Sequence, residues 1–270
     1  MKSDAIVEQA PVVSNEEVAK KIFWLKLRST YLAERTEPGQ FVNILASGNL
    51  NPLWRRPFSV ARITGNIIEI IYKVIGRGTR FMSTLKVDDT ANLLGPLGNS
   101  FNVQNTDNRI PMLIGGGLGF APLIILRDAL VNSGIDPVLF MGTPTQSEHY
   151  YKKDNKAGLL LSSDDGSLGY HGFVTDLLSN YLAENATSNQ YVAYSCGPEP
   201  MMAKVAAICR KHNIPLQLSI EREMACGIGF CQGCVIEQVP PQRKYALVCK
   251  DGPIFDAKTL QFTQDDHGES

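Results

Sequence analysis

Four cysteines near the end of the chain follow a spacing that few folds can use. The pattern is Cys226, four residues, Cys231, two residues, Cys234, fourteen residues and Cys249. This is the plant-type spacing for a [2Fe–2S] cluster, in which three thiolates come from one tight loop and the fourth ligand follows at a distance. We therefore predict that these four cysteines ligate such a cluster.

Glycines separate the first three ligands, at positions 227, 229 and 233. Glycine lets the backbone wrap closely around a cluster and point N–H groups at the sulfurs, which tunes the reduction potential. A structural zinc site is the main alternative, but zinc ribbons usually pair two C-x2-C knuckles and this segment has one. That alternative, a non-enzymatic zinc-binding protein with a vestigial nucleotide fold, stays open at this stage.

Disulfides are a weaker alternative for the six cysteines. No cysteine precedes Cys196, and four of the six lie between Cys226 and Cys249. A framework of stapling bridges would spread along the chain, so the clustered set favours a metal site. Cys209 follows Ala206, Ala207 and Ile208 in a predicted helix and is interpreted as a small core residue.

The first hundred residues have the pattern of short strands. Phe23, Leu25 and Leu27 alternate with polar or larger residues, which is the period of a half-buried strand. Segments 39–46, 57–63 and 67–75 follow at short intervals, separated by Gly, Asn and Pro clusters. This spacing predicts an antiparallel barrel or sandwich, with 78–85 as one helix-like insertion.

Strands and helices alternate from Arg109 onward. Helical spacing over 120–132 stops at Gly134, which suits the position after a helix C-cap. The alternation predicts a parallel sheet with helices on its faces. The predicted strands are 110–114, 136–142, 159–163, 191–196 and 215–221, and the predicted helices are 120–132, 173–182 and 198–212.

Three loops of this second half fall at the carboxyl ends of predicted strands, where open parallel sheets bind ligands. The first is a glycine loop without the G-x-G-x-x-G spacing, and small residues there let a backbone approach a pyrophosphate. In the second, Cys196 would sit near a reactive ring, although a buried strand-end thiol is the commoner role. The third is either a polar turn or a ribose contact. The candidate residues for a dinucleotide are Gly115, Gly116, Gly117, Gly119, Asp165, Cys196, Gly197 and Pro198.

Two short motifs in the first half suit a flavin nucleotide. Arg56, Pro57, Phe58 and Ser59 offer a cation for a pyrophosphate, a flat apolar face and a hydroxyl. Gly78 and Thr79 then open the helix-like insertion, where free N–H groups favour an anion. Each motif alone is weak, because such a tetrapeptide arises by chance and a glycine–threonine pair is often an ordinary turn with an N-cap.

The charge balance and the apolar segments exclude other classes. Lys and Arg number 26 and Asp and Glu 27, so the basic excess of a nucleic-acid-binding protein is absent. The longest uncharged stretch, 110–126, is shorter than the ~20 apolar residues that span a bilayer. The N-terminus has no continuous apolar stretch of a secretion signal. We expect a cytoplasmic protein, in which thiols stay reduced.

The motifs together resemble the ferredoxin–NADP reductase-like superfamily and, within it, the electron-transfer subunits of dihydroorotate dehydrogenase B. The resemblance covers nearly the whole chain in order, and the two cysteine-bearing segments discriminate best. The matching segments are RPFS, YKVIGRGT, GGGLGFAP, DDGSLGYHGFVTDLL, SCGPEPM, EREMACGIGFCQGC and VCKDGPIFDA.

This resemblance implies an FAD-binding antiparallel β-barrel (1–108), an α/β NAD-binding domain (109–220) and a C-terminal [2Fe–2S] segment (221–270). Phe58 stands where the superfamily often has Tyr, which loses a hydroxyl and keeps the ring. The absence of arginine from 142–154 favours NAD over NADP, although Lys152 or Lys153 offers a cation for a 2′-phosphate. The implied FAD contacts are Arg56, Pro57, Phe58, Ser59, Ile71, Tyr72, Lys73, Gly78 and Thr79, and the implied cluster ligands are Cys226, Cys231, Cys234 and Cys249.

The resemblance also implies a partner. In the family, an FMN-containing catalytic subunit oxidises dihydroorotate to orotate in pyrimidine biosynthesis, and electrons pass through the cluster and FAD to NAD⁺. A heterotetramer with two copies of each subunit is the family expectation. No residue of this chain is predicted to oxidise dihydroorotate. The alternative is the same module serving a hydrogenase, a sulfur reductase or a transhydrogenase complex.

Overall fold

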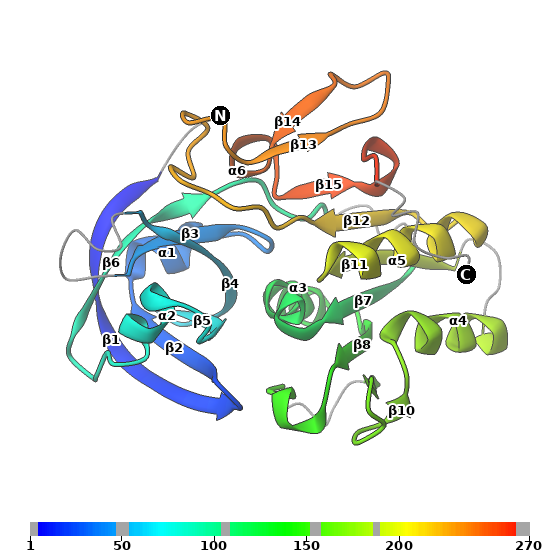
Figure 1. Cartoon of the computed structure of the whole chain (residues 1–270), viewed down its shortest axis with the longest axis horizontal. Helices are drawn as coiled ribbons and strands as arrows, with labels where there is room; N and C mark the ends of the chain where they lie inside the picture. The colour runs from blue at the N-terminus through cyan, green and yellow to red at the C-terminus, as the bar shows by residue number, and fades with distance from the viewer. Residues whose placement is uncertain (1–4, 47–53, 104–108, 152–157, 186–189, 263–270) are drawn as a thin grey trace.

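The computed structural model describes residues 5–46, 54–103, 109–151, 158–185 and 190–262. Its strands in these ranges form a closed antiparallel barrel, a seven-stranded sheet and a two-stranded sheet, as Figure 1 shows. No helix in the described part of the chain is long and apolar enough to cross a membrane. The predicted antiparallel barrel followed by a parallel-sheet domain is confirmed.

The barrel forms from the first hundred residues. Leu25 and Leu27 point into it and are fully buried, as the strand alternation predicts. The longest strand, β1, was not expected, because its sequence does not alternate and it pairs with β6 far along the chain. In barrel order the strands are β1 (Ile6–Ala19), β2 (Ile22–Arg28), β5 (Ile67–Lys73), β4 (Arg56–Thr64), β3 (Phe41–Leu45) and β6 (Thr90–Leu97), with α1 (Thr30–Arg35) and α2 (Arg77–Met82) between strands.

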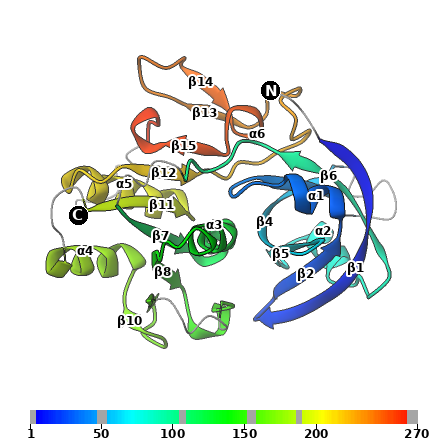
Figure 2. The same ribbon diagram turned by 180° about the vertical axis from the view of Figure 1, so that it is seen from behind.

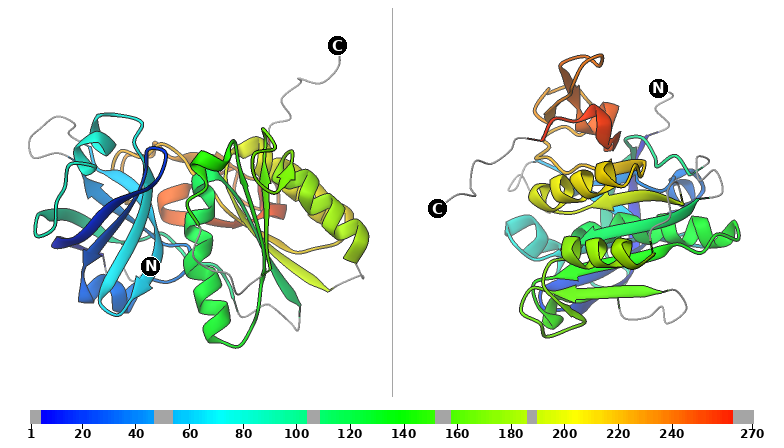
Figure 3. Two further views of the ribbon diagram at one scale, coloured as in Figure 1. Left: turned by 90° about the horizontal axis from the view of Figure 1, so that it is seen from below. Right: turned by 90° about the vertical axis from the view of Figure 1, so that its right-hand side faces the viewer.

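The seven-stranded sheet is parallel except at one edge. Helix α3 covers the face toward the barrel, and α4 and α5 cover the other face (Figures 1 and 3). Gly134 takes φ +79° just after the C-cap of α3, as the sequence predicts. In sheet order the strands are β10 (Tyr170–His171), β9 (Leu159–Ser163), β8 (Val138–Thr143), β7 (Ile110–Gly116), β11 (Tyr191–Cys196), β12 (Leu216–Ser219) and β15 (Ile254–Asp256), and the helices are α3 (Ala121–Asn132), α4 (Val174–Asn185) and α5 (Glu199–Lys211).

The C-terminal segment lies over both larger parts, as Figures 1 and 2 show from opposite sides. Its last strand, β15, pairs antiparallel with β12 and so extends the sheet of the second part. The division at residue 220 stays a prediction, and the two parts share this sheet edge. The segment contains β13 (Val235–Glu237), β14 (Tyr245–Leu247) and α6 (Val248–Asp251), and short 3-10 turns span Gly117–Phe120, Gln146–Glu148 and Ala257–Thr259.

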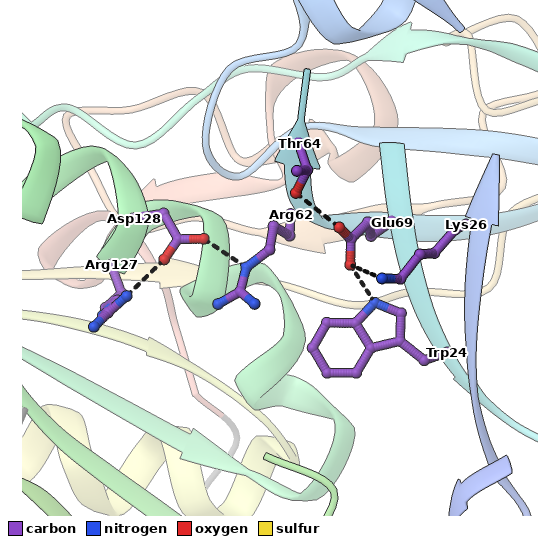
Figure 4. Close-up of polar contacts among 7 residues, drawn as sticks. All are labelled: Trp24, Lys26, Arg62, Thr64, Glu69, Arg127 and Asp128. Atoms are coloured by element: carbon purple, nitrogen blue, oxygen red, sulfur yellow. Dashed lines mark hydrogen bonds and ion pairs between the residues drawn. The ribbon is translucent and has the colours of Figure 1, made fainter. Parts of the chain in front are cut away.

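An ion pair joins the barrel to the nucleotide-binding part (Figure 4). Arg62 of β4 donates from Nε to Oδ2 of Asp128 in α3 at 2.7 Å. Beside it, the buried Glu69 carboxylate accepts from Trp24 Nε1 at 2.7 Å. Helix α3 follows the glycine loop and β4 carries the flavin-type tetrapeptide, so this contact links the two predicted nucleotide sites.

Candidate cofactor sites

Three of the four predicted cluster ligands lie in the loop before β13, and the fourth, Cys249, lies in α6. Cys231 is exposed, whereas Cys234 and Cys249 are buried. Backbone N–H groups point at three of the sulfurs: Gly229 donates to Cys249 Sγ at 3.1 Å, Cys231 to Cys226 Sγ at 3.3 Å and Cys249 to Cys234 Sγ at 3.3 Å. Such donors stabilise thiolates, which are the ligating form.

The thiols lie as two pairs. Cys226 is within hydrogen-bond reach of Cys231, and Cys249 is within reach of Cys234. Among the described residues, no three His, Cys, Asp or Glu side chains converge on a point that would hold a single metal ion. Two thiolate pairs are what a cluster of two irons requires, because each iron takes two protein ligands. The residues therefore fit a [2Fe–2S] cluster better than one zinc ion.

The two pairs differ electrostatically. Burial opposes ionisation of Cys226, but the N–H groups of Cys231 and Ile228 outweigh it and lower the pKa of that thiol to about 7. Burial, followed by the neighbouring Cys234, raises the pKa of Cys249 to about 12. Cys226 thus ionises readily, whereas Cys249 needs a metal to displace its proton.

Two of the three loop glycines are required by the backbone. Gly227 has φ +70°, and a Cβ there would lie 2.0 Å from Asn43 Nδ2. Gly229 has φ +80°, and a Cβ there would meet the Lys250 side chain at 2.9 Å. Gly233 has only ordinary contacts, so it is not needed for the same reason.

The two flavin-type motifs meet at one cavity of about 580 Å³. Thr79 Oγ1 accepts from the backbone N–H groups of Ile75 and Gly76, so its hydroxyl caps the short α2. Arg56 Nη1 donates to the carbonyl of Trp54 at 2.9 Å, which holds the guanidinium near the cavity rim. The cavity is lined by Arg56, Pro57, Phe58, Ile75, Gly76, Arg77, Gly78 and Thr79. A cation, an aromatic face and a glycine turn at one place fit a flavin nucleotide.

The other predicted flavin residues lie elsewhere. Ser59 is in β4 but does not line this cavity. Ile71 and Tyr72 are buried, and the Tyr72 hydroxyl donates to Asn15 Oδ1 at 3.0 Å. Lys73 Nζ pairs with Glu148 at 2.7 Å and lines the neighbouring cavity. Their assignment to FAD stays a prediction.

That neighbouring cavity, of about 530 Å³, lies at the carboxyl edge of the sheet. Gly116, Gly117, Gly119, Gly197 and Pro198 line it, so the structure brings both predicted strand-end loops together. They touch at Gly119, where a Cβ would lie 2.4 Å from the Cys196 carbonyl oxygen. Small residues there let one dinucleotide span both loops.

Three predicted nucleotide residues do not line this cavity. A Cβ on Gly115 would collide with Phe120 at 2.6 Å, so this glycine serves packing of the loop. Cys196 is fully buried, and burial raises the pKa of its thiol well above the ordinary value. The exposed Asp165 carboxylate accepts from Ser167 Oγ at 2.6 Å, and its neighbour Asp164 lines the cavity instead.

Several cavity residues were missed from the sequence. Glu148 pairs with Lys73, which was predicted as a flavin contact, and only the folded structure reveals this ion pair between the barrel and the α/β part. Phe173 is 54% exposed, with Lys204 Nζ 5.3 Å from its ring centre. Glu221 follows β12 at the same sheet edge, so the strand-end rule would have found it. Lys152 and Lys153 lie outside the described residues.

Two family models match the chain. The iron–sulfur cluster binding domain of dihydroorotate dehydrogenase B matches residues 221–261. An oxidoreductase NAD-binding domain matches residues 113–207. Together with the ferredoxin-reductase-like fold, these matches confirm the predicted cofactors: FAD, a [2Fe–2S] cluster and NAD. They also remove the zinc alternative.

Curated relatives match over nearly their full length. The dihydroorotate dehydrogenase B (NAD(+)) electron transfer subunit of Fusobacterium nucleatum subsp. nucleatum is 35% identical, covering 94% of this chain and 98% of that one. The protein of the same name from Geobacillus sp. (strain WCH70) is 36% identical, covering 93% and 96%.

Solved structures show the same fold. The structure described as the NADH-dependent reduced ferredoxin-NADP oxidoreductase, in work on flavin-based electron bifurcation, has a TM-score of 0.82. It is 26% identical, covering 94% of this chain and 90% of that one. A ferredoxin-NADP⁺ reductase of Plasmodium falciparum, with a TM-score of 0.62 and 16% identity, shares the fold over 76% of this chain and 90% of its own. From the curated relatives and the cluster-domain match, the chain belongs to the family of dihydroorotate dehydrogenase B electron-transfer subunits.

Proposed function

We propose that this chain carries electrons between an FMN-containing dihydroorotate dehydrogenase catalytic subunit and NAD⁺, in pyrimidine biosynthesis. The observation that carries the proposal is the presence of three sites on one chain: the paired thiols, the cavity at Arg56 and the cavity at Gly119. When bound, NAD exchanges electrons in pairs as hydride, the cluster exchanges them singly, and FAD does both.

The chain's own residues bind and orient these groups. The cluster loop supplies thiolates and N–H donors from Gly229 and Cys231. Arg56, Phe58, Gly78 and Thr79 line the FAD cavity, and Lys73 reaches from the same barrel into the NAD cavity. We propose that electrons pass from the cluster to FAD and from FAD to NAD⁺, because only FAD exchanges electrons both singly and in pairs.

Exposed apolar side chains beside the cluster support a partner at this end. Ile228 is 56% and Phe230 is 86% exposed, and both lie between Cys226 and Cys231. Large exposed apolar residues around a functional group are typical of an interaction surface. We assign this surface to the catalytic subunit and propose two copies of each subunit in the complex.

We also propose a cytoplasmic location. All six cysteines are free thiols, and four of them would be lost to oxidation outside a reducing compartment. The near-zero net charge of −1 gives no support for a nucleic-acid partner.

Co-expression with a candidate FMN-containing catalytic subunit tests the proposal. The complex should reduce NAD⁺ with dihydroorotate, whereas this chain alone should only oxidise NADH with artificial acceptors. Cys231→Ala should abolish the first activity and leave the second. Full dihydroorotate-dependent activity in that variant would disprove the route through the cluster.

A second function has one specific observation in its favour. The 26% identical structure at TM-score 0.82 covers nearly the whole chain and is named for exchange between NADH, ferredoxin and NADP. The same module would then serve a complex of the transhydrogenase kind, whereas hydrogenase and sulfur reductase partners have no such support. Purification of the chain from its source with its natural partner distinguishes the two functions.

A further inference from the structure

Asn43 is a buried polar residue on the outer face of the barrel. It is 1% exposed and lies in β3 between Val42 and Ile44, which point into the barrel core. Its Nδ2 donates to the carbonyl oxygen of Cys226 at 3.3 Å. Asn43 thus joins the first cluster ligand to the barrel that carries the FAD cavity.

Asn43 also lies beside the FAD cavity. It is the cross-strand partner of Pro57 in β4, and Pro57 lines that cavity. Side chains of directly paired residues lie on the same face of a sheet, within about 5 Å of each other. One residue therefore separates the Cys226 peptide from the predicted flavin contact.

The fit between Asn43 and the cluster loop is tight. Gly227 follows Cys226, and any Cβ on it would lie 2.0 Å from Asn43 Nδ2. The loop can approach the barrel this closely only because position 227 has no side chain, so the contact fixes the loop along β3.

Barrel stability does not explain the amide. In the described part of the chain, Asn43 Oδ1 is buried and has no hydrogen-bond partner. An unpaired buried acceptor destabilises the folded state, and an apolar side chain would fill this position without that loss. The contact with Cys226 is what the amide adds.

We propose that Asn43 is a positioning residue for electron transfer, which holds the Cys226 end of the cluster loop against the strand pair at the FAD cavity. The proposal rests on the proposed function, in which electrons cross from flavin to cluster at this contact. Asn43 touches no reacting group itself and acts through the position of Cys226.

The test compares the full chain, loaded with FAD and cluster, in four forms: wild type, Asn43→Leu, Asn43→Asp and Gln40→Leu. Leucine keeps the size of the side chain and removes the donor, whereas aspartate keeps the shape and places an acceptor against the Cys226 carbonyl. Gln40→Leu is the matched control, because that amide donates to the Gly98 carbonyl at 2.9 Å and not to the carbonyl of a predicted ligand. Iron and FAD contents are measured for each form.

Each protein is mixed with NADH, and two signals are followed: flavin bleaching, and the electron paramagnetic resonance of the reduced cluster in rapidly frozen samples. We expect flavin bleaching at the wild-type rate in all forms. Cluster reduction should slow severalfold in both Asn43 variants, because a displaced Cys226 lengthens the path from flavin to cluster. The control should match the wild type.

Equal rates of cluster reduction in all forms would overturn the positioning role. Loss of the cluster from both Asn43 variants, with Gln40→Leu retaining it, would also overturn it and make Asn43 an assembly determinant. If NADH fails to reduce the cluster of the wild type, the proposed function fails instead, so the two failures are distinguishable.

Discussion

Gly119 is the position where the glycine loop meets the loop after β11, and substitution there should separate the two halves of the NAD cavity. In Gly119→Ala, the new Cβ would lie 2.4 Å from the Cys196 carbonyl oxygen and 2.5 Å from Gly197 Cα. Both are backbone atoms, so no side chain can rotate away. Gly119 does not have a positive φ, so the effect is steric and not conformational.

The size of the effect follows from these distances. The Cβ contact falls about 1 Å short of the 3.4 Å at which ordinary contact begins, so the loops must part by that amount. Overpacking of this kind costs about 1–3 kcal/mol of folding free energy. A displacement of about 1 Å at a reacting geometry lowers kcat/KM by up to ~100-fold.

The assay is NADH oxidation with an artificial acceptor, together with thermal unfolding. Gly158→Ala is the matched control, because Gly158 has open space around its Cβ position and ordinary φ. We expect kcat/KM for NADH to fall at least about tenfold in Gly119→Ala and to stay unchanged in the control. Equal kcat/KM values in the two variants would refute the assignment of both loops to one dinucleotide.

Three further predictions test other contacts. Arg56→Ala should weaken FAD retention about tenfold or more, as expected for loss of a charge-assisted bond. Flavin fluorescence after dilution measures the released FAD. Arg80→Ala, a helix α2 variant outside the cavity, is the control and should show no such release. Phe230→Ser should weaken binding of the catalytic subunit in titration calorimetry without changing NADH oxidation by the isolated chain. The control is Val87→Ser, which removes a side chain that is 61% exposed on the barrel. Equal affinities of the two variants for the catalytic subunit would reject the docking surface. A double-mutant cycle on Arg62 and Asp128 should give a coupling free energy of about 1 kcal/mol in urea unfolding, and zero coupling would show that the pair does not hold the two parts together.

Much of the fold followed from local patterns. Leu25 and Leu27 marked a strand by alternation, and Gly134 marked the end of a helix, because both signals depend on neighbours in the sequence. The grouping of the four predicted cluster ligands was predictable for the same reason, since three of them share one loop. β1 was missed because its pairing with β6 joins Ile6 to Gly95, a contact that no local window contains.

The residues of the candidate sites also divide into those that a local pattern predicts and those that only the folded contacts reveal. The glycine loop and the loop after β11 were predictable, because both follow strands of a parallel sheet. That Asp164 lines the cavity and Asp165 does not was not predictable, because it depends on the turn that directs the Asp165 carboxylate to Ser167. The Lys73–Glu148 pair and the Asn43 contact join distant segments and have no signature in either one.

The pairing of β12 with β15 has a consequence for how the cluster segment is attached. Ser219, the last residue of β12, is the register partner of Ile254, the first residue of β15. Everything between them, including all four predicted cluster ligands, is therefore an excursion whose two ends meet at adjacent strands. A hairpin turn of a few residues would join those strands equally well. The cluster segment thus has the topology of an exchangeable cassette, and its removal would leave a two-cofactor reductase with its sheet intact.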